Sequence, residues 1–169
     1  MKKNKIKDTG LEVTELSFGT SSLGSMPDTY GYEVPEDRAQ KTLNRFFQGP
    51  VNMLDTSRNY AMGESEKRIG KAIKENGGWP NGFLLSTKLD RNMDTLILDK
   101  NRVRESLEES LKTLNVDSVD ILFLHDPEYA KDITDITKKD GAMDELFKIK
   151  NEGLAKGAGV AMGKVDIMF

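Results

Sequence analysis

The feature that most constrains the fold of this chain is a repeated alternation of short apolar runs with longer segments of helical pattern. Five apolar runs recur, at residues 16–22, 51–57, 83–89, 119–126 and 156–162. This alternation indicates βα units and a parallel sheet, because parallel strands need a long crossover connection that is usually a helix. No linker rich in proline or serine interrupts the pattern. We therefore predict one domain over residues 1–169.

The segments between the apolar runs predict four helices, each with one apolar face. These helices are expected from about Pro35 to Phe47, from about Glu64, from Asn101 to Leu114 with Asp99 as N-cap, and from Gly141 to Asn151. Their expected inward residues are Ala39, Leu43, Phe46 and Phe47, then Ile69, Ala72 and Ile73, then Val103, Leu107, Leu111 and Leu114, and finally Met143, Leu146 and Phe147. Residues 5–16 predict a small hairpin that turns at Thr9-Gly10, and residues 165–169 resemble the opening of a further helix.

Two architectures fit such a repeat, a doubly wound sheet and a (β/α) barrel. In a barrel, functional side chains come from the carboxyl ends of several strands and converge on one face. The strand ends here offer Asp55, with Tyr60 on the following loop, then Lys88, then His125. A dinucleotide-binding doubly wound sheet would show G-x-G-x-x-G after the first strand, and residues 18–25 lack it. We predict an α/β fold of the (β/α)8 TIM-barrel type, reduced to about five βα units after a short N-terminal hairpin.

Composition excludes several classes of protein. The chain has no cysteine, which rules out disulfides, thiol nucleophiles and thiolate metal sites. The formal net charge is -3 and the basic residues are spread along the chain, so neither nucleic acid nor a membrane is an expected partner. No apolar stretch approaches the length of a membrane-spanning helix, and the N-terminus lacks the apolar region of a signal peptide. We expect a cytoplasmic protein.

Each of the four polar residues has an ordinary structural explanation when it is considered alone. Asp55 could satisfy backbone N–H groups of its loop, and Lys88 could be an exposed strand end. His125 is the only histidine of the chain, and a lone histidine beside an apolar strand is more often hydrogen-bonded structure than a catalyst. Tyr60 lies in a turn-rich segment, where exposed aromatic residues are common. The functional interpretation depends on all four, because a barrel brings their strand ends into one pocket.

Together the four residues form a proton-transfer device. A phenol such as that of Tyr60 is a reluctant acid or base at neutral pH, but a nearby ammonium stabilises its anion. Lys88 can supply that ammonium, and Asp55 can keep it charged and oriented. The neutral imidazole of His125 can then donate a hydrogen bond to a substrate oxygen. Such a site would protonate a carbonyl oxygen as charge develops on it, or run the reverse on an alcohol.

None of these side chains can deliver a hydride. An oxidoreductase built on them therefore requires a bound nicotinamide cofactor. Without such a cofactor, the same residues fit an isomerase or a lyase.

Several motifs, in this order and spacing, resemble the aldo-keto reductase superfamily, in particular its bacterial and fungal branch of aldose, fucose and pyridoxal dehydrogenase-like members. The motifs are LDTSRNYAMGESEKRIGKAI, LSTKLD, LEESLKTLNVDSVDILFLHDPE and GLAKGAGVAM, and the likeness runs from LEVTELSFGTSSLG onwards. The resemblance implies a (β/α)8 barrel that binds NADP(H) or NAD(H) without a Rossmann motif and needs no metal. It also implies reversible reduction of a small-molecule aldehyde, ketone or sugar, with an alcohol or lactone as the other partner of the reaction.

The resemblance also assigns roles to individual residues. Tyr60 matches the general acid/base of the family, Lys88 and Asp55 match the pair that tunes it, and His125 matches the residue that orients the carbonyl. In the same way, Gly19 and Thr20 match positions near the nicotinamide.

The chain departs from the family pattern in two respects. The fifth strand of the family often ends in Ser-Asn, which binds the nicotinamide carboxamide, whereas Ala161 and Met162 stand here. A TIM barrel also has eight strands in about 250 residues, whereas five are predicted here. We therefore expect the N-terminal portion of such a protein, without most of the cofactor site. The alternative is a catalytically inactive truncated relative or an interaction module, and open sheet edges would favour self-association.

Overall fold

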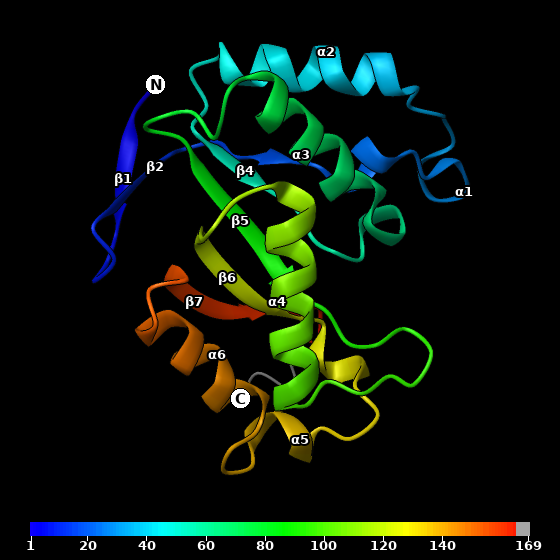
Figure 1. Cartoon of the computed structure of the whole chain (residues 1–169), viewed down its shortest axis with the longest axis vertical. Helices are drawn as coiled ribbons and strands as arrows, with labels where there is room; N and C mark the ends of the chain where they lie inside the picture. The colour runs from blue at the N-terminus through cyan, green and yellow to red at the C-terminus, as the bar shows by residue number, and fades with distance from the viewer. Residues whose placement is uncertain (165–169) are drawn as a thin grey trace.

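Five parallel strands lie in the sheet in the same order as in the chain (Figure 1). The computed structural model describes residues 1–164, so the helix expected at 165–169 lies outside the described residues. The strands are β3 (Phe18–Gly19), β4 (Met53–Asp55), β5 (Leu84–Leu89), β6 (Val119–His125) and β7 (Ala155–Ala161). A doubly wound sheet reverses its strand order at a switch point, and this sheet does not. The structure thus confirms the prediction of a (β/α)-barrel type of sheet.

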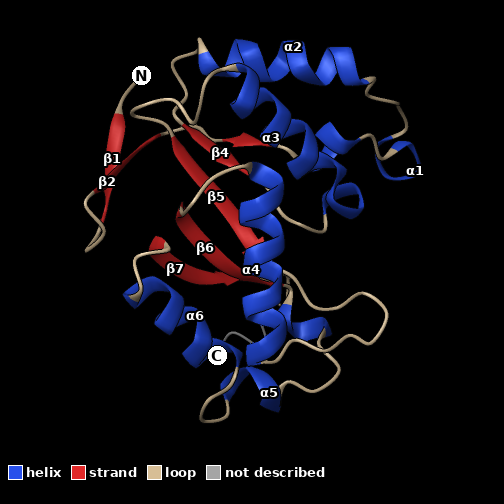
Figure 2. Ribbon diagram, viewed as in Figure 1, coloured by secondary structure: helices blue, strands red, loops and turns tan. Residues whose placement is uncertain are grey.

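Helices connect the strands and cover one face of the curved sheet, while the N-terminal hairpin stands apart from them (Figure 2). The main helices are α2 (Glu36–Phe47), α3 (Glu64–Glu75), α4 (Lys100–Leu114) and α6 (Ala142–Asn151). Short helical segments lie in the connections: η1 (Ser21–Gly24), α1 (Pro27–Tyr30), η2 (Tyr60–Gly63), η3 (Pro127–Tyr129) and α5 (Thr134–Thr137). The four main helices are the four that the sequence predicts, and Asp99 caps α4 by accepting the N–H of Arg102 at 2.9 Å.

The main core lies between the sheet and these helices. Most of the expected inward residues of the helices are fully buried there, among them Leu43, Ile69, Ile73, Val103 and Leu107. Burial of such an apolar face supplies most of the stability of a helix in a folded protein.

One of the expected inward residues was predicted wrongly. Phe147 points outward and is 48% exposed. Ala142, Leu146 and Ile149 form the buried face of α6 instead. Successive residues of an α-helix are rotated by about 100°, so the position directly after Leu146 cannot share its direction.

A second, smaller apolar cluster joins the N-terminal hairpin to the other face of the sheet. The hairpin consists of β1 (Lys3–Ile6) and β2 (Leu11–Thr14), and the cluster is centred on Leu11, Leu84 and Ile121. Each of these side chains belongs to a strand whose neighbouring residues face the opposite way, as the two-residue period of a strand requires.

Asn52 fastens this hairpin to the amino-terminal end of the sheet. Its amide oxygen accepts the N–H of Thr14 at 2.9 Å and the hydroxyl of Thr14 at 3.1 Å. Its amide nitrogen donates to the carbonyl groups of Glu12 and Gly82. Asn52 is buried, so these hydrogen bonds close this end of the sheet without leaving its polar atoms unpaired.

Helices α3 and α4 approach each other closely at Gly70. A Cβ atom at this position would lie 2.0 Å from the carbonyl oxygen of Thr113. Glycine is therefore required by space rather than by backbone conformation.

Within residues 1–164, β3 pairs with β4 alone and β7 with β6 alone. Self-association through these edges stays a prediction. In the same part of the chain, no helix combines the length and the apolar character needed to cross a membrane. The cytoplasmic location also stays a prediction.

Candidate active site

The structure brings the four predicted site residues together at the carboxyl end of the sheet. Asp55 ends β4, Lys88 lies near the end of β5, His125 ends β6, and Tyr60 begins η2 directly after β4. Tyr60 and His125 meet edge to face, with 5.9 Å between their ring centroids. Three adjacent parallel strands and the segment after β4 thus bring all four side chains to one place, as a barrel requires.

Lys88 is the centre of this group. Its ammonium nitrogen donates to Asp55 Oδ2 at 2.8 Å, to the carbonyl oxygen of Thr56 at 2.7 Å and to the Tyr60 hydroxyl oxygen at 3.1 Å. An ammonium has three hydrogens, so each has an acceptor. The side chain is only 7% exposed, and these three bonds together with the Asp55 charge offset the cost of burying a cation.

The hydrogen bond from Lys88 leaves the hydroxyl hydrogen of Tyr60 available for donation. Because the Tyr60 oxygen accepts a hydrogen bond from Lys88, its own hydrogen can point to a different acceptor. The Lys88 charge also stabilises the phenolate that remains after this proton has left.

Asp55 is held by its neighbours on both sides. Its Oδ1 atom accepts the hydroxyl of Ser86 at 2.8 Å, and the strand register places Gly19, Asp55 and Ser86 side by side. The backbone oxygen of Asp55 accepts both the N–H and the hydroxyl of Thr20. The Asp55 carboxylate is therefore already oriented for Lys88.

Gly19 and Thr20, the two predicted cofactor positions, lie beside this group but differ in what they offer. Thr20 is buried, and its hydroxyl is engaged by Asp55. Gly19 is exposed, and a Cβ atom added to it would meet nothing within 4 Å. The space next to Asp55 is thus open at Gly19.

The backbone directly after Tyr60 makes an unusual turn within η2. Ala61 (φ 50°), Met62 (φ 55°) and Gly63 (φ 92°) lie consecutively in the left-handed region. This region costs a residue with a Cβ atom about 1–2 kcal/mol. At Gly63 it is the φ value that favours glycine, whereas a Cβ atom there would meet only the guanidinium of Arg58, at the far end of a flexible side chain.

His125 has two partners that the sequence interpretation missed. Its Nδ1 atom lies 2.6 Å from Asp90 Oδ1 and 3.1 Å from the hydroxyl oxygen of Ser57. The Ser57 hydroxyl donates to Asp90 Oδ2 at 2.7 Å, and the N–H of Asn59 donates to the same oxygen at 3.1 Å. Asp90 is 2% exposed, so this network is buried beneath the imidazole.

A buried carboxyl group lies behind the site. Glu66 of α3 is fully buried and accepts the hydroxyl of Thr87, the neighbour of Lys88, at 2.7 Å. Burial raises the pKa of Glu66 to about 7, against lowering contributions from the hydroxyl of Thr87 and from Arg58. Glu66 is therefore largely protonated at mildly acidic pH.

A polar cavity of about 240 Å³ includes Asp90, the partner of His125, in its wall, and none of the four predicted site residues lines it. Its remaining lining is mostly polar: Arg58, Asn59, Met62, Arg91, Asn92, Met93, Asp94, Arg102 and Glu109. Met62 is 92% exposed at its rim. A space of this kind suits a hydroxylated or charged small molecule better than an apolar one.

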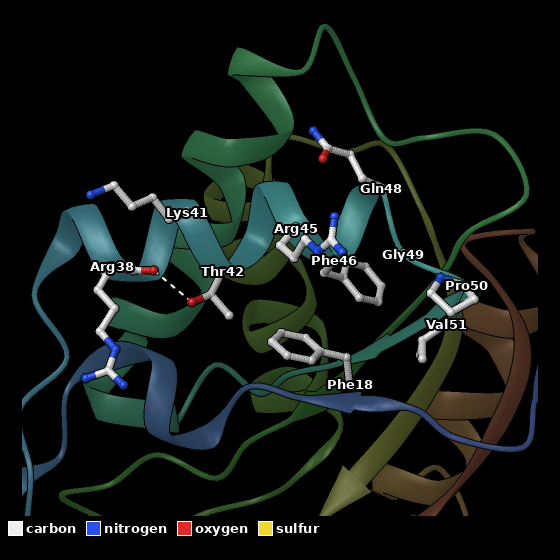
Figure 3. Close-up of a pocket in the computed structure, with 10 residues that line it drawn as sticks. All are labelled: Phe18, Arg38, Lys41, Thr42, Arg45, Phe46, Gln48, Gly49, Pro50 and Val51. Carbon is white, nitrogen blue, oxygen red and sulfur yellow. Dashed lines mark hydrogen bonds between the residues drawn. The ribbon is translucent and has the colours of Figure 1, made fainter.

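A separate cavity of about 530 Å³ lies under α2 and contains none of the predicted site residues (Figure 3). The rings of Phe18 and Phe46 face each other in it, with 5.1 Å between their centroids. Arg38, Lys41 and Arg45 extend from α2 around it.

Comparison with known proteins places this chain in one family. The model of the aldo/keto reductase family matches residues 15–168. L-galactose dehydrogenase of Arabidopsis thaliana is 35% identical over 160 residues, which are 95% of this chain and 48% of that protein. Aldo-keto reductase YhdN of Bacillus subtilis (strain 168) is 30% identical over 171 residues, which are 99% of this chain and 49% of that protein.

Solved structures agree with this result. The holo form of aldo-keto reductase AKR11C1 from Bacillus halodurans matches with a TM-score of 0.78 at 26% identity, over 99% of this chain and 52% of that one. The chain thus spans about half the length of the curated relatives it matches.

Proposed function

The chain belongs to the aldo/keto reductase family, and from this premise we propose that it carries the proton-transfer half of an NAD(P)-dependent oxidoreductase that interconverts carbonyl and hydroxyl groups. Tyr60 is the proposed acid/base, with Lys88 and Asp55 tuning it and His125 contacting the substrate oxygen. We also propose that residues 1–169 form part of a single domain.

The observation that carries this proposal is that all three ammonium hydrogens of Lys88 have acceptors, one of which is the Tyr60 oxygen. Its bond to the Tyr60 oxygen leaves the phenol hydrogen available to a substrate oxygen. In the direction of reduction, Tyr60 gives this hydrogen to the carbonyl oxygen as negative charge develops there, and Lys88 stabilises the phenolate that results. In the direction of oxidation, the phenolate takes the hydroxyl hydrogen back.

A nicotinamide cofactor fits the open space beside Asp55. Gly19 would let the ring approach, because no side chain fills that space. Ala161 and Met162 would offer the carboxamide only backbone groups, and Asp126 already donates its N–H to the Ala161 carbonyl at 2.7 Å. When bound, the cofactor supplies or accepts the hydride that no side chain of the site can provide.

The substrate class that we propose is a small sugar or other hydroxylated carbonyl compound. Two relatives are named for such substrates, L-galactose dehydrogenase and the D-threo-aldose 1-dehydrogenase of Pseudomonas sp. The polar lining of the cavity beside Asp90 supports the same class, because it offers many hydrogen-bonding groups.

The proposal is tested by titrating the 169-residue chain with NADPH and with NADH while nucleotide fluorescence is followed. Expected results are saturable binding and carbonyl-dependent oxidation of the nucleotide. Tyr60→Phe should retain the binding and lower the oxidation rate at least about 100-fold, because a positioned general acid typically contributes that much. Tyr30→Phe, a change of the same size at an exposed tyrosine, is the control. A folded chain that shows no binding at millimolar nucleotide would refute the proposal.

A further inference from the structure

We propose that Asp90 is a positioning residue that fixes the tautomer of His125, so that the neutral imidazole presents a lone pair at Nε2 rather than an N–H group. The inference rests on the proposed function for the identity of the site. It changes one expectation of the sequence analysis, in which the neutral imidazole donates to a substrate oxygen.

Three groups surround the Asp90 carboxylate. Oδ2 accepts the Ser57 hydroxyl at 2.7 Å and the N–H of Asn59 at 3.1 Å. Oδ1 has His125 Nδ1 at 2.6 Å. A carboxylate can only accept hydrogen bonds, and one that is 2% exposed is costly to leave without donors. His125 Nδ1 therefore carries a hydrogen and donates it to Oδ1.

Ser57 is not the donor to the imidazole. The Ser57 oxygen lies 3.1 Å from His125 Nδ1, so its single hydrogen could point there. Asp90 Oδ2 would then lose that donor, and Oδ1 would face a nitrogen lone pair at 2.6 Å. Two acceptors at that separation repel each other, so the hydroxyl hydrogen belongs to Asp90.

The opposite side of the ring is open. Among residues 1–164, Nε2 has no hydrogen-bond partner, and Asp126 Oδ2 lies 3.8 Å from it. The other ionisable groups facing the ring are Asp90 itself and Tyr60, whose oxygen is bonded to Lys88. A neutral ring with its hydrogen on Nδ1 has a lone pair at Nε2, and that lone pair is available to a substrate.

With this tautomer, His125 prefers a substrate oxygen that carries a hydrogen. Neutral His125 can accept a hydrogen bond from a hydroxyl group of the substrate, whereas a carbonyl oxygen is served by Tyr60 alone. His125 donates to a carbonyl oxygen only after it takes a second proton, when Nδ1–H faces Asp90 and Nε2–H faces the substrate. The site therefore matches hydroxylated substrates, either an alcohol or a carbonyl compound with a neighbouring hydroxyl.

The test uses the one histidine of the chain, because its two ring nitrogens give unambiguous signals in a long-range ¹H–¹⁵N NMR spectrum. The 169-residue chain is measured without nucleotide, at alkaline pH where the histidine signals no longer change. We expect the form with hydrogen on Nδ1 to dominate by at least about tenfold, because hydrogen bonds to ionised groups are the stronger class.

Asp90→Asn should move the hydrogen to Nε2. The backbone N–H of Asn59 is shared between the Ser57 hydroxyl oxygen and Asp90 Oδ2, at 3.1 Å from each, and it can only donate, so the amide oxygen of the new side chain should occupy the Oδ2 position. Its NH₂ group then faces His125 Nδ1 and donates to it. Ser57→Ala removes the other neighbour of Nδ1 and should leave the hydrogen on Nδ1.

Hydrogen on Nε2 in the unchanged protein, or an unaltered tautomer in a folded Asp90→Asn variant, would overturn the inference. If that variant does not fold, the tautomer of the unchanged protein decides alone. This readout needs no cofactor, so it can fail while nucleotide binding and turnover succeed, and the reverse also holds.

Discussion

Replacing the buried Glu66 by glutamine should stabilise the protein at pH 8 far more than at pH 5. The Glu66 side chain is fully buried between α3, β5 and α4, and it accepts a hydrogen bond from Thr87. Among the described residues its second oxygen, Oε2, has no partner. Burial raises the pKa of this carboxyl from 4.5 to about 7, which means that ionising it costs more in the folded protein than in the unfolded chain.

The sign and size of the effect follow from proton linkage. Since the folded state holds this proton more tightly than the unfolded chain, Glu66 contributes stability below pH 4.5. That contribution is lost as the pH rises from 4.5 to about 7. A shift from 4.5 to about 7 corresponds to about 3 kcal/mol in total. Between pH 5 and pH 8 about 2.5 kcal/mol of this should disappear, because the unfolded carboxyl is already partly ionised at pH 5.

The assay is urea unfolding of the unchanged protein and of Glu66→Gln at pH 5 and pH 8. Glutamine places an amide that does not titrate in the same space, and any cost of burying that amide is the same at both pH values. The free energy of unfolding of the variant, relative to the unchanged protein, should therefore rise by about 2.5 kcal/mol between the two pH values. Glu75→Gln, at an exposed position of the same helix, should show little change. An equal difference at both pH values would refute the argument that Glu66 is protonated in the folded protein.

Three further substitutions test a close helix contact, a buried hydrogen bond and a helix cap, with urea unfolding as the common measurement. Gly70→Ala should cost about 1–3 kcal/mol, because its Cβ atom would overlap the Thr113 carbonyl and push α3 from α4; an unchanged midpoint would contradict this close approach. Asn52→Ala should cost at least about 2 kcal/mol, because it leaves the buried N–H of Thr14 unpaired. Hydrogen exchange should then accelerate in the N-terminal hairpin before it does in the five-stranded sheet. Asp99→Ala should cost about 1 kcal/mol through loss of the α4 cap, and an effect near zero would show that the cap contributes nothing.

The sequence predicts the strands and the main helices because each shows a short-range period, and it predicts the four site residues because they stand at or just after the ends of the strands. Asp90 and Ser57 were missed although the same rule reaches them. Side chains alternate along a strand, so Asp90 follows Lys88 and Ser57 follows Asp55 at the spacing that returns to the same side. Extending the strand-end argument by two residues would have found both.

Other parts of the structure could not be predicted from the periodic spacing of apolar residues. The turn after Tyr60 places Ala61 and Met62 in the left-handed region, which residues of these types rarely adopt on their own. Contacts between η1 and η2 must hold them there, since the Ala61 side chain lies so near Gly24 that a Cβ atom on Gly24 would be 2.4 Å away. The error at Phe147 is of a different kind, because the helical period already separates this position from Leu146, and Ala142 and Ile149 complete the buried face instead.

The order of the strands in the sheet is also the order in which a ribosome makes them. Each new strand pairs with the one made just before it, and paired residues such as Thr87 and Leu122, or Leu122 and Ala158, are about 35 residues apart. Pairing over such moderate separations lets a chain fold without waiting for distant segments. The amino-terminal units can therefore dock while later ones are still being synthesised, so the growing edge of the sheet moves from β3 towards β7 during translation.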